Sequence, residues 1–316
     1  MLRIAILDDY QNVALSLADW SRLDNEVEIK VFTENLGSED DAAAALADFD
    51  VLCLMRERMP LPATLIERLP RLKLVNVTGA RVRVIDTEFA RSKGIVVCHT
   101  YPGESRFATP EMAWGLILAC ARNIPSEDAR VRAGGWQQTI GTTVGGKTLG
   151  LVGLGKLGSR MVPVARAFEM DVIAWSQNLT DERAAEIGVR RVSKAELFEQ
   201  ADVVSIHLVL SDRSRNTIGK AEIDAMKPGT TLINTSRGPL VDESALLEAL
   251  EAGRIKAGLD VFDVEPLPAD HPLRNAPNTV LTPHLGYVVE EAYGRFYSDI
   301  IDNIIAWRDG APIRVL

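Results

Sequence analysis

The segment Gly153-Leu154-Gly155-Lys156-Leu157-Gly158 follows a short apolar run, 149–152, and opens a stretch with helix-forming residues that extends through Phe168. Gly153 at the first position allows a tight turn, Gly155 lets the backbone approach a pyrophosphate, and Gly158 lets helix and strand pack closely. The free N–H groups at the start of such a helix bind anions. The segment therefore predicts a dinucleotide-binding turn that includes Lys156 and Leu157, with a plain glycine turn as the alternative.

The pattern around this segment alternates between strand and helix. In the second half of the chain the expected strands are 150–152, 172–175, 203–206, 231–234, 257–261 and 280–282. In the first hundred residues they are 3–7, 28–32, 51–55, 73–77 and 95–97, with helices expected over 41–47 and 62–69. Strands that alternate with helices indicate parallel sheets. We therefore predict an α/β protein with two doubly wound parallel sheets, one of the Rossmann type and a smaller one of the flavodoxin type.

A chain of 316 residues is long enough for two domains. We expect a dinucleotide-binding domain over 100–287 and a substrate domain over 1–99 and 288–316, because a long amphipathic helix over 290–307 would return to the first domain.

A second helix is expected over 111–121, with Pro110 in its first turn and Met112 and Trp114 on its surface. This helix is apolar almost all round, which predicts burial, with a second subunit as one partner.

The composition is that of a globular enzyme, with 47% hydrophobic and 25% charged residues and a net charge of −9. Such a balance argues against nucleic acid and anionic membrane surfaces as partners. The three cysteines, Cys53, Cys98 and Cys120, lie in apolar stretches and fit buried free thiols in a reducing compartment. The sequence shows no signal peptide, spanning run or metal-binding motif, so we expect a soluble cytoplasmic protein without a metal.

The position that selects between NAD and NADP lacks its usual acid. About 20 residues after the glycine turn, an acid at the end of the second strand commonly binds the ribose 2′-hydroxyl of NAD. Ser176 and Gln177 stand there instead, and no arginine adjoins them to bind a 2′-phosphate. Both NAD(H) and NADP(H) therefore remain open as cofactors.

Three further segments each place polar residues after an expected strand: Asn234-Thr235-Ser236-Arg237-Gly238, Gly258-Leu259-Asp260-Val261-Phe262-Asp263-Val264-Glu265-Pro266, and Thr282-Pro283-His284-Leu285-Gly286. Together with the glycine turn, their order and spacing closely resemble the D-isomer-specific 2-hydroxyacid dehydrogenases, a family that includes phosphoglycerate dehydrogenases and glyoxylate and hydroxypyruvate reductases. The resemblance extends over nearly the whole chain. It implies an NAD(P)-dependent oxidoreductase that transfers a hydride between nicotinamide and C2 of a small 2-hydroxy or 2-keto acid.

The resemblance implies three catalytic residues, whose chemistry suits this reaction. His284 would exchange a proton with the substrate oxygen, since imidazole titrates near neutrality. Glu265 would favour the charged ring and fix its orientation. Arg237 would bind the substrate carboxylate through its planar guanidinium. A surface ion pair, a turn acid and a loop histidine are the alternative interpretations of these three residues.

The resemblance also implies further contacts. Asp260 would hold the nicotinamide carboxamide, or cap a loop as a strand-end acid, and His207 would line the adenosine side or be a structural histidine. Thr235, Ser236 and Gly286 complete the expected cofactor contacts. The expected substrate-binding residues are Thr78, Gly79, Ala80, Arg81, Arg237 and His284.

Arg81 departs from the smaller residues usual in its loop, so it either contacts a second anionic group of the substrate or points to solvent. The Arg56 and Arg58 side chains raise the same question, and Tyr287 could shape the pocket. The resemblance further implies a homodimer. A dinucleotide-sensing corepressor on the same scaffold is the alternative function, and the identity of the acid stays open.

Overall fold

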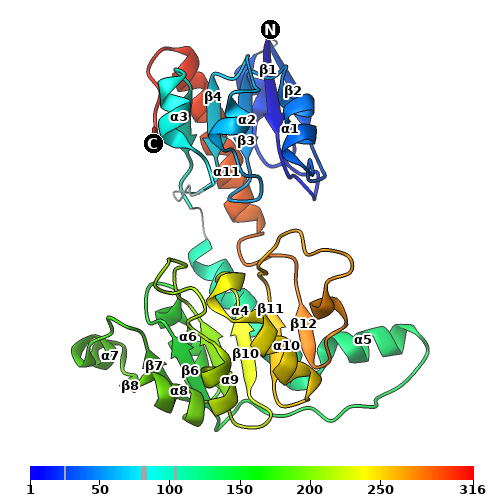
Figure 1. Ribbon diagram of the computed structural model, residues 1–316, viewed down its shortest axis with the longest axis vertical. Helices are drawn as coiled ribbons and strands as arrows, with labels where there is room; N and C mark the ends of the chain where they lie inside the picture. The colour runs from blue at the N-terminus through cyan, green and yellow to red at the C-terminus, as the bar shows by residue number, and fades with distance from the viewer. Residues whose placement is uncertain (25, 80–83, 103–104) are drawn as a thin grey trace. The chain divides into compact units, whose positions relative to one another are not determined.

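The computed structural model describes residues 1–24, 26–79, 84–102 and 105–316 (Figure 1). Two compact units form: unit 1 contains 1–105 and 289–316, and unit 2 contains 106–288. The boundaries expected from the sequence, 99/100 and 287/288, lie six residues and one residue earlier in the chain, respectively. Each unit has its own sheet and its own hydrophobic core.

Unit 1 holds a five-stranded parallel sheet in the order β2-β1-β3-β4-β5. Its strands are β1 (Leu2–Ile6), β2 (Val27–Val31), β3 (Val51–Leu54), β4 (Leu74–Val77) and β5 (Val96–His99). Its helices are η1 (Trp20–Leu23), α1 (Glu39–Leu46), α2 (Ala63–Ile66), α3 (Thr87–Ser92) and α11 (Glu290–Arg308). The predicted flavodoxin-like order is confirmed, and the inner strands β3 and β4 are buried at every residue, as continuous apolar runs predict.

The C-terminal helix α11 packs on η1 and β4 of this unit (Figure 1). Its apolar stripe, which includes Tyr293, Phe296, Ile300 and Ile304, is buried at helical spacing. The amphipathic pattern in the sequence therefore predicted the helix and its buried face correctly.

Unit 2 holds a seven-stranded parallel sheet in the order β12-β11-β10-β9-β6-β7-β8. Its strands are β6 (Thr148–Val152), β7 (Asp171–Trp175), β8 (Arg190–Arg191), β9 (Val203–Ile206), β10 (Thr231–Asn234), β11 (Lys256–Leu259) and β12 (Thr279–Leu281). The direction of the strand order reverses beside β6, which is the switch point of a doubly wound sheet. The six predicted strands form, and a seventh, β8, is added at the edge by two exposed arginines that carry no strand signal.

The helices of unit 2 are α4 (Ser105–Arg122), α5 (Ile124–Arg132), α6 (Gly158–Ala167), α7 (Asp181–Ile187), α8 (Lys194–Gln200), α9 (Lys220–Ala225) and α10 (Glu243–Glu251), and among them α5 has no buried residue. Two short 3-10 turns, η2 (Gly238–Leu240) and η3 (Pro272–Asn275), follow β10 and β11.

Two expectations about α4 were wrong. The helix begins at Ser105, so Pro110 lies inside it and not in its first turn. Trp114 is buried in the core of unit 2 with Ala113, Leu116 and Ile117, instead of lying on the surface. The buried residues of α4 therefore pack in the core of unit 2.

The three cysteines are free and buried, as predicted. Burial raises the pKa of the Cys98 thiol to about 11 and that of the Cys120 thiol to about 12. Thiols that stay protonated at neutral pH are poor nucleophiles, so these cysteines act as small apolar residues.

Candidate functional site

The glycine turn between β6 and α6 gives its three glycines different tasks. Gly153 has a φ of 106°, and its N–H donates to the carbonyl of Trp175 at 2.8 Å. A side chain at Gly158 would collide with the carbonyl of Gly153. Gly155, by contrast, is exposed and has open space where a Cβ would stand. Lys156 is exposed beside it, and Leu157 precedes the first residue of α6.

Ser176 and Gln177 follow β7, the direct neighbour of β6. Val152 and Trp175 are paired in register, so both residues leave the sheet at the same edge as the glycine turn. Arg183 is bound to Glu186 at 2.8 Å within the exposed helix α7. The side chain of Arg183 is thus paired within α7.

His207 lies beneath the glycine turn, at the end of β9. Its Nε2 and the hydroxyl oxygen of Ser205 are 2.9 Å apart, and its Nδ1 is buried. Burial lowers the pKa of this ring to about 4, which keeps it neutral at physiological pH. The space at Gly153 is filled by the carbonyl of His207. This geometry agrees with the structural alternative for His207, and the adenosine contact stays a prediction.

The turn after β10 carries three predicted site residues. The Ser236 hydroxyl donates to the carbonyl of Ile206 at 2.7 Å, which ties this turn to β9. The hydroxyl oxygen of Thr235 is buried and has no partner among the described residues. Arg237 is half-buried and donates from Nη1 to the carbonyl of Ser236 at 2.7 Å. No Cβ would fit at Gly238, because the backbone of the 262–263 loop lies against it.

Glu265 and His284 form a hydrogen-bonded pair at this edge. The Nδ1 of His284 lies 2.6 Å from Oε2 of Glu265, while Oε1 accepts the N–H of Phe262 at 2.9 Å. Burial acts to raise the pKa of Glu265, but the hydrogen bond and charge of His284, with a smaller contribution from Arg237, lower it on balance. An ionised carboxylate can only accept hydrogen bonds, so Nδ1 carries the proton of this bond and Nε2 faces away from Glu265.

The sheet order explains why the three predicted catalytic residues gather. Arg237 follows β10, Glu265 lies in the loop after β11, and His284 follows β12, and these strands are neighbours in the order β12-β11-β10. Parallel strands end at the same edge, where ligands bind in open α/β sheets. Tyr287 is buried beside them, with its ring centroid 5.4 Å from that of His284 in an edge-to-face contact.

Asp260 binds the loop that carries His284. Its carboxylate is fully buried and accepts three hydrogen bonds, from the Thr282 hydroxyl at 2.6 Å, the Leu285 N–H at 2.7 Å and the Gly286 N–H at 2.8 Å. Burial raises its pKa, and these three bonds and the charge of His284 only partly oppose that effect. Both oxygens of Asp260 and the N–H of Gly286 are therefore engaged within the protein, although the sequence suggested them as cofactor contacts.

The predicted substrate residues of unit 1 are likewise bound to their own unit. The buried hydroxyl oxygen of Thr78 accepts the N–H of Arg56 at 2.8 Å, and the N–H of Gly79 donates to the Thr100 hydroxyl oxygen at 2.8 Å. The Arg56 guanidinium fills the space beside Gly79, where a Cβ would collide with it. Ala80 and Arg81 lie outside the described residues.

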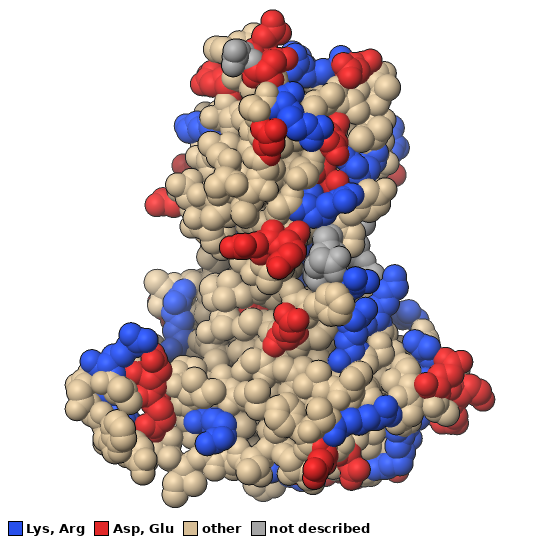
Figure 2. Space-filling model, turned by 180° about the vertical axis from the view of Figure 1, so that it is seen from behind, with Lys and Arg blue, Asp and Glu red and all other residues tan. Residues whose placement is uncertain are grey.

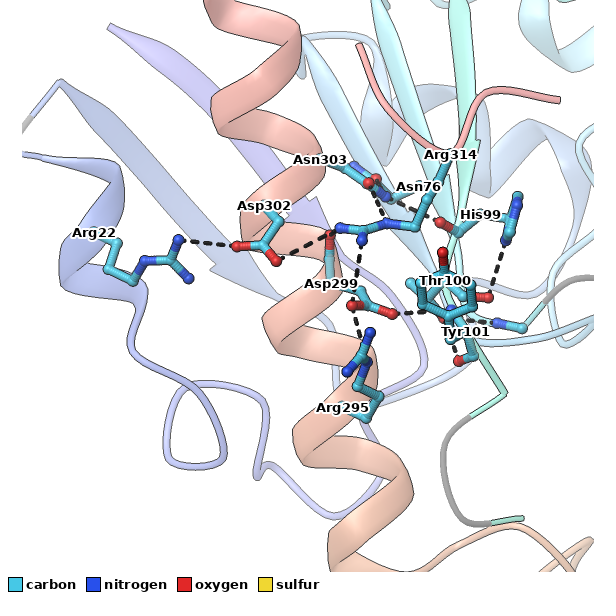
Figure 3. Close-up of polar contacts among 11 residues, drawn as sticks. Arg22, Asn76, His99, Thr100, Tyr101, Arg295, Asp299, Asp302, Asn303 and Arg314 are labelled. Carbon is cyan, nitrogen blue, oxygen red and sulfur yellow. Dashed lines mark hydrogen bonds and ion pairs between the residues drawn. The ribbon is translucent and has the colours of Figure 1, made fainter. Parts of the chain in front are cut away.

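The sequence did not reveal a polar network that holds the next segment of unit 1 against α11 (Figure 3). The buried carboxylate of Asp299 accepts the N–H of Tyr101 at 2.9 Å and binds Arg295 at 3.0 Å. Arg314 lies 3.5 Å from the same carboxylate and donates from Nε to Asn303 at 2.8 Å. The signal in the sequence was the presence of the polar residues Asp299 and Asn303 on the buried face of the amphipathic helix α11.

The described residues also show how charge lies on the surface and whether metal-ligand clusters or membrane-spanning helices occur. Figure 2 shows basic and acidic side chains interspersed on the face drawn. Among the residues that the structure describes, no three His, Cys, Asp or Glu side chains gather as metal ligands. No helix within the same described ranges combines the length and apolar character needed to cross a bilayer.

Residues 114–286 match the family model described as D-isomer specific 2-hydroxyacid dehydrogenase, NAD binding domain. A glyoxylate reductase from Aeropyrum pernix is 38% identical over 256 residues, which cover 78% of this chain and 76% of the relative. The solved structure of a phosphoglycerate oxidoreductase from Vibrio cholerae superposes with a TM-score of 0.92 at 36% identity, covering 98% of this chain and all of that one. The chain therefore belongs to the D-isomer specific 2-hydroxyacid dehydrogenase family, and unit 2 contains its NAD-binding domain.

Other relatives are much longer. A D-3-phosphoglycerate dehydrogenase from Bacillus subtilis is 35% identical over 288 residues, which cover 90% of this chain but 54% of the relative. The chain thus spans about half the length of the phosphoglycerate dehydrogenases that it matches.

Proposed function

We propose that this protein is an NAD(P)-dependent oxidoreductase that transfers a hydride between nicotinamide and C2 of a small D-2-hydroxy acid or 2-keto acid. The observation that carries the proposal is the Glu265–His284 pair at 2.6 Å, with its ionised carboxylate, at the sheet edge that also holds Arg237. The family match supports the same reaction class, and the D configuration rests on that match.

The residues of the glycine turn fit a dinucleotide. Open space at Gly155 would admit the pyrophosphate, and the buried Thr235 hydroxyl has no hydrogen-bond partner in the part of the chain that the structure describes. Ser176 and Gln177 would lie along the adenosine ribose, and a bound NAD(P)H supplies the hydride for C2. We assign cofactor binding to residues 100–287 and substrate binding to 1–99 with 288–316.

The chemistry of the three catalytic residues follows from their atoms. Arg237 would bind the substrate carboxylate with its guanidinium and orient the neighbouring carbonyl. His284 would donate the Nε2 proton to the carbonyl oxygen as C2 gains the hydride, so that the keto acid becomes a hydroxy acid. Glu265 would stabilise the charged ring before this transfer and hold its plane. In the oxidative direction the proton returns to Nε2.

Relatives and solved structures carry the names of phosphoglycerate, glyoxylate and D-lactate enzymes. The substrate panel therefore contains glyoxylate, hydroxypyruvate, pyruvate and the phosphorylated three-carbon 2-keto acid. NADH and NADPH are tested separately, because Ser176 and Gln177 offer neither a carboxylate to repel a 2′-phosphate nor a cation to bind one.

The test follows nicotinamide absorbance at 340 nm with wild type, His284→Ala and His271→Ala. His271 forms a second histidine–carboxylate pair, 3.1 Å from Glu243, and serves as the matched control. We expect turnover by wild type and His271→Ala and its loss in His284→Ala. Cofactor binding without turnover on any acid would overturn the proposal and favour the dinucleotide-sensing alternative.

We also propose a homodimer formed through the segment around α5 and the following loop. Ile124 and Val131 are each 53% exposed, Trp136 is 75% exposed and Ile140 is 95% exposed. Such a run of exposed apolar residues favours contact with another surface. Light scattering should give twice the chain mass of 34.6 kDa for wild type and the chain mass for Trp136→Ser with Ile140→Ser. A wild-type monomer would contradict the dimer.

The free thiols support a cytoplasmic location.

A further inference from the structure

The backbone of His284 adopts an unusual conformation. Its φ is 56°, in the left-handed region that residues with a Cβ rarely occupy. Such a conformation persists only where neighbouring groups hold it. The contacts of the loop 282–286 therefore decide where the imidazole stands.

Two elements hold this loop at Gly286, one through its N–H and one through its carbonyl. From the end of β11, Asp260 accepts the N–H of Gly286 at 2.8 Å, along with its bonds to Thr282 and Leu285. From α4, the Thr109 hydroxyl donates to the carbonyl of Gly286 at 2.8 Å. A Cβ at Gly286 would stand 3.0 Å from the Asp260 carboxylate and 3.7 Å from Thr109, so the residue fits between them with little space.

The geometry points to Thr109 as a positioning residue for His284, acting together with Asp260 through the backbone of Gly286. This inference rests on the proposed function, because His284 is taken there as the proton donor. The Glu265–His284 distance of 2.6 Å depends on where the loop 282–286 lies. Loss of the Thr109 bond would leave Gly286 held on one side only, and a misplaced imidazole lowers the rate of proton transfer.

The place of Thr109 in the chain gives this bond a second consequence. Thr109 follows the first boundary between the units, at 105/106, and Gly286 precedes the second, at 288/289. The chain crosses between the two units twice, and this hydrogen bond joins two residues of unit 2 that lie close in sequence to the two crossing points.

The test compares Thr109→Val, which removes the hydroxyl, with Thr109→Ser, which keeps it. We expect Thr109→Val to lower kcat about tenfold, the effect of one hydrogen bond of about 1.4 kcal/mol, with an unchanged Kd for NADH. Thr109→Ser should retain most of the wild-type kcat. Thr279→Val is the matched control, because the Thr279 hydroxyl also donates to a backbone carbonyl, that of Ala276 at 2.9 Å, at the opposite end of β12.

Hydrogen exchange of the peptide 282–288 provides a measurement that needs no substrate. The N–H groups of Leu285 and Gly286 should exchange faster in Thr109→Val than in wild type, Thr109→Ser or Thr279→Val. Wild-type exchange and kcat in Thr109→Val would overturn the inference, as would equal losses in Thr109→Val and Thr109→Ser. Absence of turnover in wild type would overturn the proposed function instead, while the exchange data would still show whether Thr109 holds the loop.

Discussion

The carboxyl edges of the two sheets differ in what their polar residues bind. In unit 2, Arg237, Glu265 and His284 follow three neighbouring strands and keep half-exposed polar atoms at the edge. In unit 1, the Thr78 hydroxyl and the Gly79 N–H follow β4 and are bonded to their own unit. A position after a parallel strand therefore predicts that residues gather, whereas their hydrogen-bond partners decide whether their atoms can serve a ligand.

Replacement of Glu265 by Gln tests the chemistry of the unit 2 edge and should have the largest effect. We expect kcat/KM to fall by about 100-fold or more, because an amide cannot stabilise the charged imidazole. The pKa of Glu265 is held below its ordinary 4.5, so the carboxylate that stabilises the charged imidazole is ionised above this lowered pKa and becomes protonated as the pH falls through it. The variant should lack this acid limb in its pH profile. A kcat/KM within threefold of wild type would contradict the assigned role.

Replacement of Asp299 by Asn tests the view that the unit 1 network stabilises structure. The Asp299 side chain is 2% exposed, so loss of its charge should lower the free energy of unfolding by about 2 kcal/mol in urea titrations. Asp302→Asn on the same helix is the control, because its side chain is 39% exposed and its ion pairs should contribute less than about 0.5 kcal/mol. Equal free energies of unfolding for the two variants would show that the buried Asp299 contributes no more to stability than the exposed Asp302.

Replacement of Gly155 by Ala tests whether the open backbone of the glycine turn approaches the cofactor. Among the described residues, no atom other than those of Gly155 and its two chain neighbours lies within 4 Å of the new Cβ, so the melting temperature should stay unchanged. The Kd for NADH should rise about tenfold, or about 1.4 kcal/mol, because the methyl group would meet the pyrophosphate. Gly115→Ala in α4 also adds a Cβ in open space and should leave the Kd unchanged. An unchanged Kd in Gly155→Ala would exclude this approach.

Replacement of His207 by Asn should have the smallest effect, on stability alone. The folded-state pKa of His207 is about 4 and the ordinary value is 6.5, so the folded state disfavours the proton. The stability that this neutral ring contributes is complete above pH 6.5 and is lost as the pH falls toward 4. Thermal melts of the variant should therefore decline less across this window than those of wild type. Parallel declines would show that His207 does not titrate as the buried ring requires.

The sequence predicted most of the fold because the inner strands are continuous apolar runs and the glycine turn marks the switch point. It missed β8, α3 and α5, which have few or no buried residues. The start of α4 and the burial of Trp114 were also misjudged, since an apolar helix does not show which neighbour covers it. These errors concern local boundaries and do not alter the order of either sheet.

The sequence motifs predicted that Arg237, Glu265 and His284 follow neighbouring strands of one sheet, and the strand order agrees. Hydrogen bonds between a side chain and the backbone of a residue far away in the sequence were not predictable. Thr109 binds Gly286 across 177 positions, and Asp299 binds Tyr101 across 198. No pattern within either segment indicates such a partner. The same holds for the Gly79 N–H, which the sequence offered to a substrate and the fold gives to Thr100.

The most direct test of the claim that the unit 2 edge performs the chemistry is the steady-state rate of NADH oxidation by His284→Gln, measured at saturating NADH beside the Kd for NADH. The Gln side chain can still hydrogen-bond to Glu265 but cannot supply a proton near neutral pH. We predict a Kd equal to that of wild type and a kcat lower by about 100-fold or more. A kcat within tenfold of wild type would contradict the account, because proton transfer would then not depend on His284.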